Sequence, residues 1–122
     1  MGQSANPRVL VVEDEYLIRM LLEDMLGELG YDLAAAVGTI AEASEHAANG
    51  EFHVAVLDVN LDGHEIYPVA DILAKRGLPF VFVTGYGERS LREPYRDRPA
   101  LQKPFQVEQL KNVLAELVAT TA

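Results

Sequence analysis

Short apolar runs of strand length alternate with stretches of helical periodicity along this chain, and no other feature limits its possible folds as much. Apolar runs lie at residues 8–13, 53–58 and 79–84, and a weaker, alanine-rich run lies at residues 32–38. Between them, apolar residues recur at the spacing of one helix face. This alternation predicts a parallel sheet with helices on both faces and right-handed crossovers.

Glycines and one capping motif mark the expected helix boundaries. Gly30 and Gly77 follow apolar helical stripes, as is typical of residues just beyond a helix C-terminus. Thr39 and Glu42 form a T-x-x-E capping box that opens a further helix, which Gly50 ends. These signals predict one helix after each of the first three expected strands.

Five β–α units account for nearly the whole chain, so no second domain is expected. We predict an α/β fold: a flavodoxin-like, doubly wound, five-stranded parallel sheet in the order 2-1-3-4-5, with the alanine-rich strand at an edge. The domain should span residues 8–119, between a flexible N-terminus at residues 1–7 and a tail at residues 120–122. Residues 85–99 are rich in proline and arginine and show little periodicity, so any helix there should be short.

Composition and charge exclude several classes of function. The 122 residues include 19 acidic and 10 basic side chains, a formal charge of −9, which repels nucleic acids and anionic membranes. No apolar run is long enough to cross a bilayer, and the N-terminus lacks the features of a signal peptide, so we expect a cytoplasmic protein. The absence of cysteine excludes disulfides and thiolate chemistry.

Polar residues stand at the ends of four expected strands, and these are Glu13, Asp14, Asp58, Thr84 and, just after the last strand, Lys103. Ligands of a doubly wound sheet bind beyond the carboxyl ends of its strands, so these side chains should converge. Carboxylates within about 4–6 Å raise one another's pKa unless a cation intervenes. Oxygen ligands with open water positions suit Mg²⁺, which the cluster is therefore predicted to bind.

Four motifs at these strand ends carry a resemblance to a known family. They read "VVEDE" at the first strand, "LDVNLDG" around Asp58, "FVTGY" at Thr84 and "KPF" at Lys103. In this order they resemble the receiver domain of two-component response regulators, over residues 8 to about 119, in its stand-alone form. The third motif is similar to that of a subgroup with a Phe-Ala-Thr-Gly-Tyr loop, although Val83 replaces the alanine.

The resemblance implies a role for each residue of the site. Asp58 would accept a phosphoryl group from a phosphohistidine. Asp14 would bind Mg²⁺ (or Mn²⁺) directly and Asp58 would be a further ligand, while Glu13 would hold the ion through water and Asn60 would offer its backbone carbonyl. Thr84 and Lys103 would contact the phosphoryl group once it has arrived. These residue types suit phosphoryl transfer, which needs positioning and the neutralisation of spreading charge.

Three positions depart from the usual receiver pattern. Asp62 stands where many receivers have proline, so the turn after Asp58 should be built differently. Ala100 stands where receivers commonly carry a switch aromatic, three residues before the lysine. We therefore hypothesise that Tyr86, two residues beyond Thr84, moves on phosphorylation; the alternative is a tyrosine packed on the surface.

The family also implies partners and a mode of action. A histidine kinase or a histidine phosphotransfer protein would donate the phosphoryl group, and a downstream protein would bind the face formed by the fourth helix, the fifth strand and the fifth helix. The protein would be a monomer or a weak homodimer and a signalling module, not a metabolic enzyme. Phosphorylation would bias a two-state equilibrium.

Other functions stay open as alternatives. A scaffold with the receiver fold would act without phosphorylation, although the intact site is evidence against it. A phosphatase of the haloacid-dehalogenase type would need a second aspartate where Asn60 stands, and a flavin carrier would need a hydroxyl-rich loop at residues 13–16. The scattered histidines should face solvent. The arginines of residues 89–98 predict a solvated face or a contact surface for an acidic partner, which Leu91 and Tyr95 could join.

Overall fold

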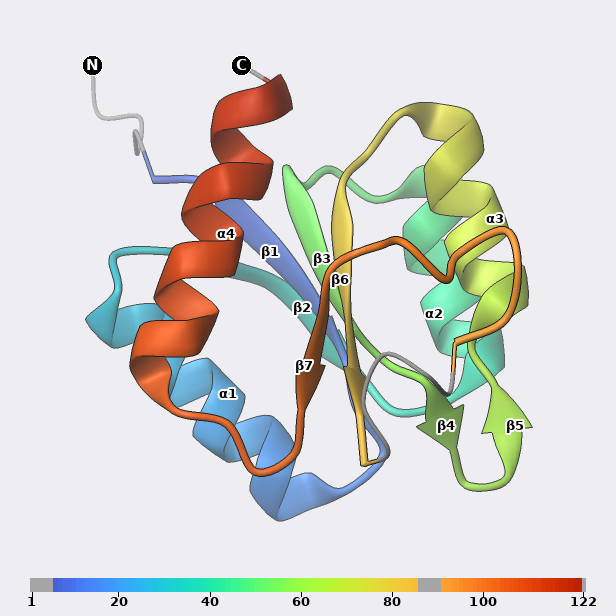
Figure 1. The fold of residues 1–122 in the computed structure, drawn as a ribbon, viewed down its shortest axis with the longest axis horizontal. Helices are drawn as coiled ribbons and strands as arrows, with labels where there is room; N and C mark the ends of the chain where they lie inside the picture. Colours follow the sequence, from blue (N-terminus) through green and yellow to red (C-terminus); the bar gives the residue numbers. More distant parts are fainter. Residues whose placement is uncertain (1–5, 86–90, 122) are drawn as a thin grey trace.

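The computed structural model describes residues 6–85 and 91–121, and its centre is a parallel sheet (Figure 1). The strand order is β2-β1-β3-β6-β7, which corresponds to the predicted 2-1-3-4-5 order of a doubly wound sheet. The weak, alanine-rich strand lies at an edge, as expected. The strands are β1 (Arg8–Val12), β2 (Asp32–Val37), β3 (Val54–Asp58), β6 (Phe80–Thr84) and β7 (Ala100–Gln102).

Helices cover both faces of the sheet, as the alternation of patterns predicts (Figure 1). Helices α1 (Tyr16–Glu28) and α4 (Val107–Thr121) pack on one face, against the alternate side chains Val9 and Val11 of β1. Helices α2 (Ile40–Asn49) and α3 (Tyr67–Arg76) pack on the other. Strands β3 and β6 are buried throughout because both of their faces are covered.

The predicted helix boundaries are confirmed. The hydroxyl of Thr39 accepts the Glu42 amide at 3.1 Å and caps α2, which ends at Gly50. Gly30 and Gly77 follow α1 and α3 with φ of 88° and 72°, the left-handed region that glycine enters without a steric penalty. Local sequence is sufficient here because caps act within a few residues.

A small hairpin that the sequence patterns did not predict follows β3. Its strands β4 (Asn60–Leu61) and β5 (His64–Glu65) are antiparallel, and the two residues between them, Asp62 and Gly63, have φ of 49° and 87°. Positive φ at both central positions is the pattern of the type I′ turn, for which Asp-Gly is a favoured sequence. The Asp-Gly pair was therefore the available signal, and the altered turn expected from Asp62 is present.

The chain between β6 and β7 contains no helix in its described part, residues 91–99. Leu91 and Tyr95 are 1% and 4% exposed and belong to the core, so the prediction that they join a contact surface is wrong. The Tyr95 ring stacks on Tyr67 and meets the ring of Phe82 edge-on, with centroids 5.9 and 5.7 Å apart. The segment thus covers the part of the sheet that a fourth crossover helix would cover.

We expect Tyr95 to contribute to stability as a core residue. Tyr95→Ala should lower the free energy of unfolding by about 3–5 kcal/mol, because it leaves a cavity beneath the segment. Tyr95→Phe should cost about 1 kcal/mol, since it removes only the hydrogen bond from the hydroxyl to Asp71. Urea unfolding measures both, with the exposed Arg96→Ala as the control. A cost below 1 kcal/mol for Tyr95→Ala would contradict the packing.

Candidate functional site

The carboxyl ends of four parallel strands place the polar residues at one rim of the sheet. Glu13 and Asp14 follow β1, Asp58 and Thr84 end β3 and β6, and Lys103 follows β7. Backbone hydrogen bonds continue past the strand ends, because the Glu13 amide donates to Val37 at 2.9 Å and the Lys103 amide to Thr84 at 2.8 Å. The rim is therefore held by the sheet ladder itself.

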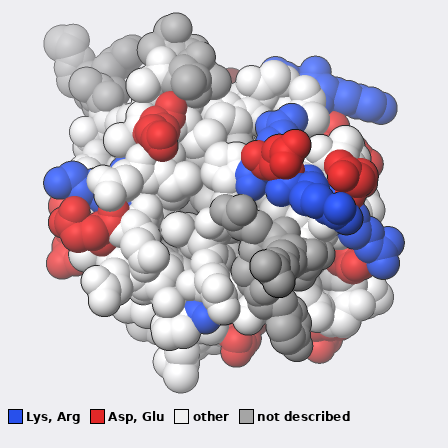
Figure 2. Space-filling model, viewed as in Figure 1, with Lys and Arg blue, Asp and Glu red and all other residues white. Residues whose placement is uncertain are grey.

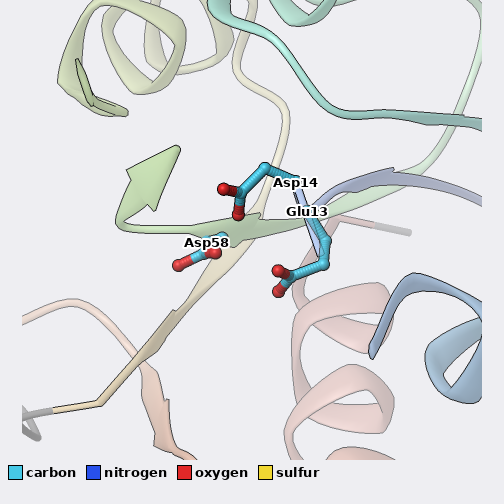
Figure 3. Close-up of side chains that lie close together, drawn as sticks. All are labelled: Glu13, Asp14 and Asp58. Atoms are coloured by element: carbon cyan, nitrogen blue, oxygen red, sulfur yellow. The ribbon is translucent and has the colours of Figure 1, made fainter. Parts of the chain in front are cut away.

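The three carboxylates form one cluster, drawn in Figure 3. One carboxylate oxygen from each of Glu13, Asp14 and Asp58 lies within 4.8 Å of the others. Glu13 is 0% exposed and Asp58 is 6% exposed. Burial and then the charge of Glu13 raise the pKa of Asp58 to about 7, and the nearby ammonium of Lys103 offsets only part of this rise. Repulsion in the cluster is therefore substantial.

Lys103 supplies the positive charge among these acids. Its Nζ lies 3.2 Å from Glu13 Oε1 and 3.3 Å from Asp58 Oδ2. Although desolvation lowers the pKa of Lys103, the charges of Asp58 and Glu13 outweigh it and raise that pKa above its ordinary value. Lys103 is thus charged at neutral pH, but one ammonium cannot neutralise three carboxylates.

The donor set fits a hard divalent cation. Glu13 Oε1 is buried, and within the part of the chain that the structure describes its close contact is the ion pair with Lys103 Nζ at 3.2 Å. Its second oxygen, Oε2, accepts the amide of Glu15 at 3.0 Å. A buried carboxylate oxygen beside two further carboxylates is a favourable environment for Mg²⁺, which prefers oxygen ligands.

Asn60 and Thr84 lie next to the predicted acceptor. The Asn60 amide donates to Asp58 Oδ1 at 3.2 Å, so the backbone that would offer the metal a carbonyl runs directly beside Asp58. Thr84 is 3% exposed and ends the strand next to β3. Tyr86 lies outside the described residues, and the hypothesis of its movement stays a prediction. Ala100 is half-buried and packs against the core.

The histidines and arginines have mainly structural contacts where they are described. His53 Nδ1 accepts the amide of Arg8 at 2.9 Å, and His64 is exposed on β5. Arg92 pairs with Glu65 at 3.2 Å, whereas the guanidinium of Arg98 lies over the Phe80 ring, 4.9 Å from its centroid. Arg92, Arg96 and Arg98 are all exposed, as the prediction of a solvated face requires, and Arg98 in addition covers the Phe80 ring.

Comparison with known proteins defines the class. Residues 9–115 match the family model described as the response regulator receiver domain, so the chain belongs to this family. Members of the family generally bind Mg²⁺. No helix in the described ranges, residues 6–85 and 91–121, combines the length and apolarity needed to cross a membrane.

Individual relatives are similar over most of the chain. Transcriptional regulatory protein PdtaR of Mycobacterium tuberculosis is 38% identical over 107 residues, which are 84% of this chain and 52% of PdtaR. The phyllosphere-induced regulator PhyR of Methylorubrum extorquens is 34% identical over 113 residues, 88% of this chain and 42% of PhyR. The chain therefore spans about half the length of these curated relatives.

Solved structures show the same fold. The solution structure of SdrG from Sphingomonas melonis Fr1 is 44% identical, with a TM-score of 0.83 over 95% of this chain and 99% of that one. The receiver domain of PhyR from Erythrobacter litoralis is 33% identical, with a TM-score of 0.80 over 93% of this chain and 91% of that one. These similarities agree with the strand order described above.

We expect the acid cluster to make metal-free stability depend on pH. Because the pKa of Asp58 rises from 3.8 to about 7 on folding, the folded state holds this proton more tightly than the unfolded chain. Its contribution to stability is therefore lost as the pH rises from about 4 to about 7. In a chelator, the free energy of unfolding of Asp58→Asn relative to that of wild type should therefore increase, on the order of 1–2 kcal/mol, between these two pH values.

Urea unfolding at a series of pH values measures this difference, and saturating Mg²⁺ should stabilise the wild type but not Asp14→Ala. A difference between wild type and Asp58→Asn that stays constant from pH 4 to 8 would contradict the strained cluster.

Proposed function

We propose that this receiver domain accepts a phosphoryl group on Asp58, in the presence of Mg²⁺, from a phosphohistidine on a histidine kinase or a histidine phosphotransfer protein. The carboxyl phosphate then changes the contacts of the domain with other proteins. The observation that supports this most strongly is the placement of the Asp58 carboxylate, beside two further acids and 3.3 Å from an ammonium. That set combines a nucleophile with the means to neutralise a phosphoryl group.

The proposed reaction is a direct transfer. A carboxylate oxygen of Asp58 attacks phosphorus and forms a P–O bond, while the P–N bond breaks and its electron pair returns to the imidazole nitrogen, which takes up a proton from water. Bound Mg²⁺ supplies neutralising charge for the phosphoryl oxygens. Asp14 and Glu13 would hold it, with the backbone carbonyl of Asn60.

The remaining residues would stabilise the product. Lys103 Nζ already contacts Asp58 Oδ2 and can pair with the phosphoryl group without a large movement. The hydroxyl of Thr84, at the end of the neighbouring strand, can donate to a phosphoryl oxygen. Turnover of external substrates is not proposed. The position of a second aspartate is held by Asn60, whose side-chain oxygen accepts the Gly63 amide at 2.7 Å.

An apolar surface beside the site offers a place for the donor. It consists of the first turns of α1, where the exposed residues are Tyr16 (64%), Leu17 (77%), Met20 (42%) and Leu21 (51%). A mainly apolar cavity of about 340 Å³ continues it to Lys103, Pro104 and Phe105. Figure 2 shows few charges over α1 and the loop leading into α4. We propose that an amphipathic helix of the donor docks there and brings its histidine to Asp58.

The downstream surface would include residues 91–99, β7 and α4. The predicted face had a fourth helix, but the described residues 91–99 are not helical, so this segment takes its place. It is connected to the sheet, because the Phe82 amide donates to Pro99 at 3.0 Å. Basic and acidic side chains are interspersed over this segment and α3, at the right of Figure 2. Arg92 and Arg96 each pair with a nearby glutamate.

Labelling with a small phosphodonor tests the acceptor and the metal together. Wild type should gain one phosphoryl group, seen by mass spectrometry of the intact protein, and labelling should fall at least tenfold in a chelator because the cluster repels the phosphoryl oxygens. Asp58→Asn should remain unlabelled. Equal labelling with and without Mg²⁺ would contradict the metal role, and an unlabelled wild type would contradict Asp58 as acceptor.

Replacing Leu17 tests the docking surface separately from the chemistry. Leu17→Ala should slow transfer from a phosphorylated histidine phosphotransfer protein by about tenfold, because a leucine buried on docking contributes about 1.5–3 kcal/mol. Labelling by a small phosphodonor should not change.

Leu33→Ala is the matched control, since Leu33 is 39% exposed and pairs with Val9 at the opposite end of the sheet. Equal rates for the Leu17 and Leu33 variants would show that the donor docks elsewhere.

A further inference from the structure

The turn of the β4–β5 hairpin makes a hydrogen bond to a predicted metal ligand. The backbone amide of Asp62 donates to Asp14 Oδ2 at 3.0 Å, although the two residues are 48 positions apart. This bond occupies one carboxylate oxygen of Asp14 and restricts the rotation of the group. The Asp14 carboxylate lies toward the cluster in Figure 3, and one of its oxygens lies within 4.8 Å of those of Glu13 and Asp58.

The position of this amide is determined by the turn. Asp62 and Gly63 have φ of 49° and 87°, and the Gly63 amide donates to Asn60 Oδ1 at 2.7 Å, which closes the turn from inside. The adjoining Leu61 is 1% exposed and anchors the hairpin in the core. Aspartate tolerates the left-handed region better than most residues, whereas proline cannot adopt it and has no amide hydrogen.

The same hairpin also orients the acceptor. The Asn60 amide donates to Asp58 Oδ1, and beyond the hairpin the Ile66 amide returns to the Val59 carbonyl at 2.9 Å. Residues 60–66 therefore hold two acids of the cluster, from different strands, through backbone amides. Hydrogen bonds of this kind orient metal ligands, and their loss typically costs about 10–100-fold in metal affinity.

We propose that Asp62 is a positioning residue for the metal site, which acts through its backbone amide and its left-handed conformation and not through its carboxylate. The inference rests on the proposed metal-dependent function, because Asp14 must be a ligand for its orientation to matter. The Asp62 side chain is exposed, and it is not among the three carboxylates that lie within 4.8 Å of one another. A neutral residue that keeps the turn should therefore preserve the site.

Substitutions at residue 62 separate the amide from the carboxylate. Asp62→Asn and Asp62→Gly keep the amide and tolerate positive φ, so the Mg²⁺ affinity should stay within about threefold of wild type. Asp62→Pro removes the amide and the left-handed conformation, so the affinity should fall by about tenfold or more. Isothermal titration with MgCl₂ measures all four proteins, and circular dichroism in a chelator verifies their fold.

A second measurement does not depend on the proline variant being folded. The Asp62 amide proton, identified by NMR in the metal-free protein, should shift upfield in Asp14→Ala because it loses a charged acceptor. The Gly63 amide, which bonds to Asn60, should not shift in the same way. An Asp62 amide that does not shift in Asp14→Ala would show that this hydrogen bond is absent in solution, which would overturn the positioning role.

The outcomes distinguish this inference from the proposed function. If wild type binds no Mg²⁺, the proposed function fails. If wild type binds Mg²⁺ and a folded Asp62→Pro binds it equally well, or the Asp62 amide does not respond to Asp14→Ala, the positioning role is wrong. If Asp62→Asn and Asp62→Pro lose affinity equally, the carboxylate is the active group and the inference is overturned.

Discussion

Burial of Asp58 beside the charge of Glu13, at the rim where Asp14 also lies, is the constraint on which the rest of this structure depends. Two of these three acids are almost completely buried, and the single ammonium of Lys103 compensates them only in part. Such a cluster is unfavourable in a metal-free protein, and it is maintained because the sheet and the hairpin hold its members in place. The same strain favours a divalent cation and, with it, a dianionic phosphoryl group. The acids that lower the stability of the metal-free fold are thus the same acids that the proposed phosphoryl transfer uses.

Two different parts of the fold hold the cluster: buried strands of the sheet on one side and the β4–β5 hairpin on the other. Strands β3 and β6 are buried throughout, and backbone hydrogen bonds continue from them to Lys103. The hairpin instead uses a two-residue turn whose amides reach Asp14 and Asp58. The turn thus contacts two acids of the cluster that come from different strands. It is a separate means of adjusting metal affinity.

Residues 91–99, between β6 and β7, contribute to the core although they do not form the helix that regular β–α alternation would place there. Tyr95 stacks on Tyr67 and meets two phenylalanines of β6, and burial together with the Asp71 carboxylate raises the pKa of its hydroxyl to about 12. The segment is also connected to the hairpin, through the ion pair between Arg92 and Glu65. A change at the acceptor loop therefore has a contiguous set of contacts leading to the proposed downstream surface.

The strand order, the helix caps and the rim on which the polar residues lie could all be predicted from sequence patterns. Strand-type and helix-type periodicities are local, and a parallel sheet brings all its carboxyl ends to one edge. Other features depended on the tertiary structure. Burial of Leu91 and Tyr95 could not be predicted because arginines and prolines obscure any periodicity there. The hydrogen bond of the Asp62 amide could not be predicted either, because its acceptor, Asp14, lies 48 residues away. The raised pKa of Asp58 likewise arises from distances between separate strands, which no local pattern contains.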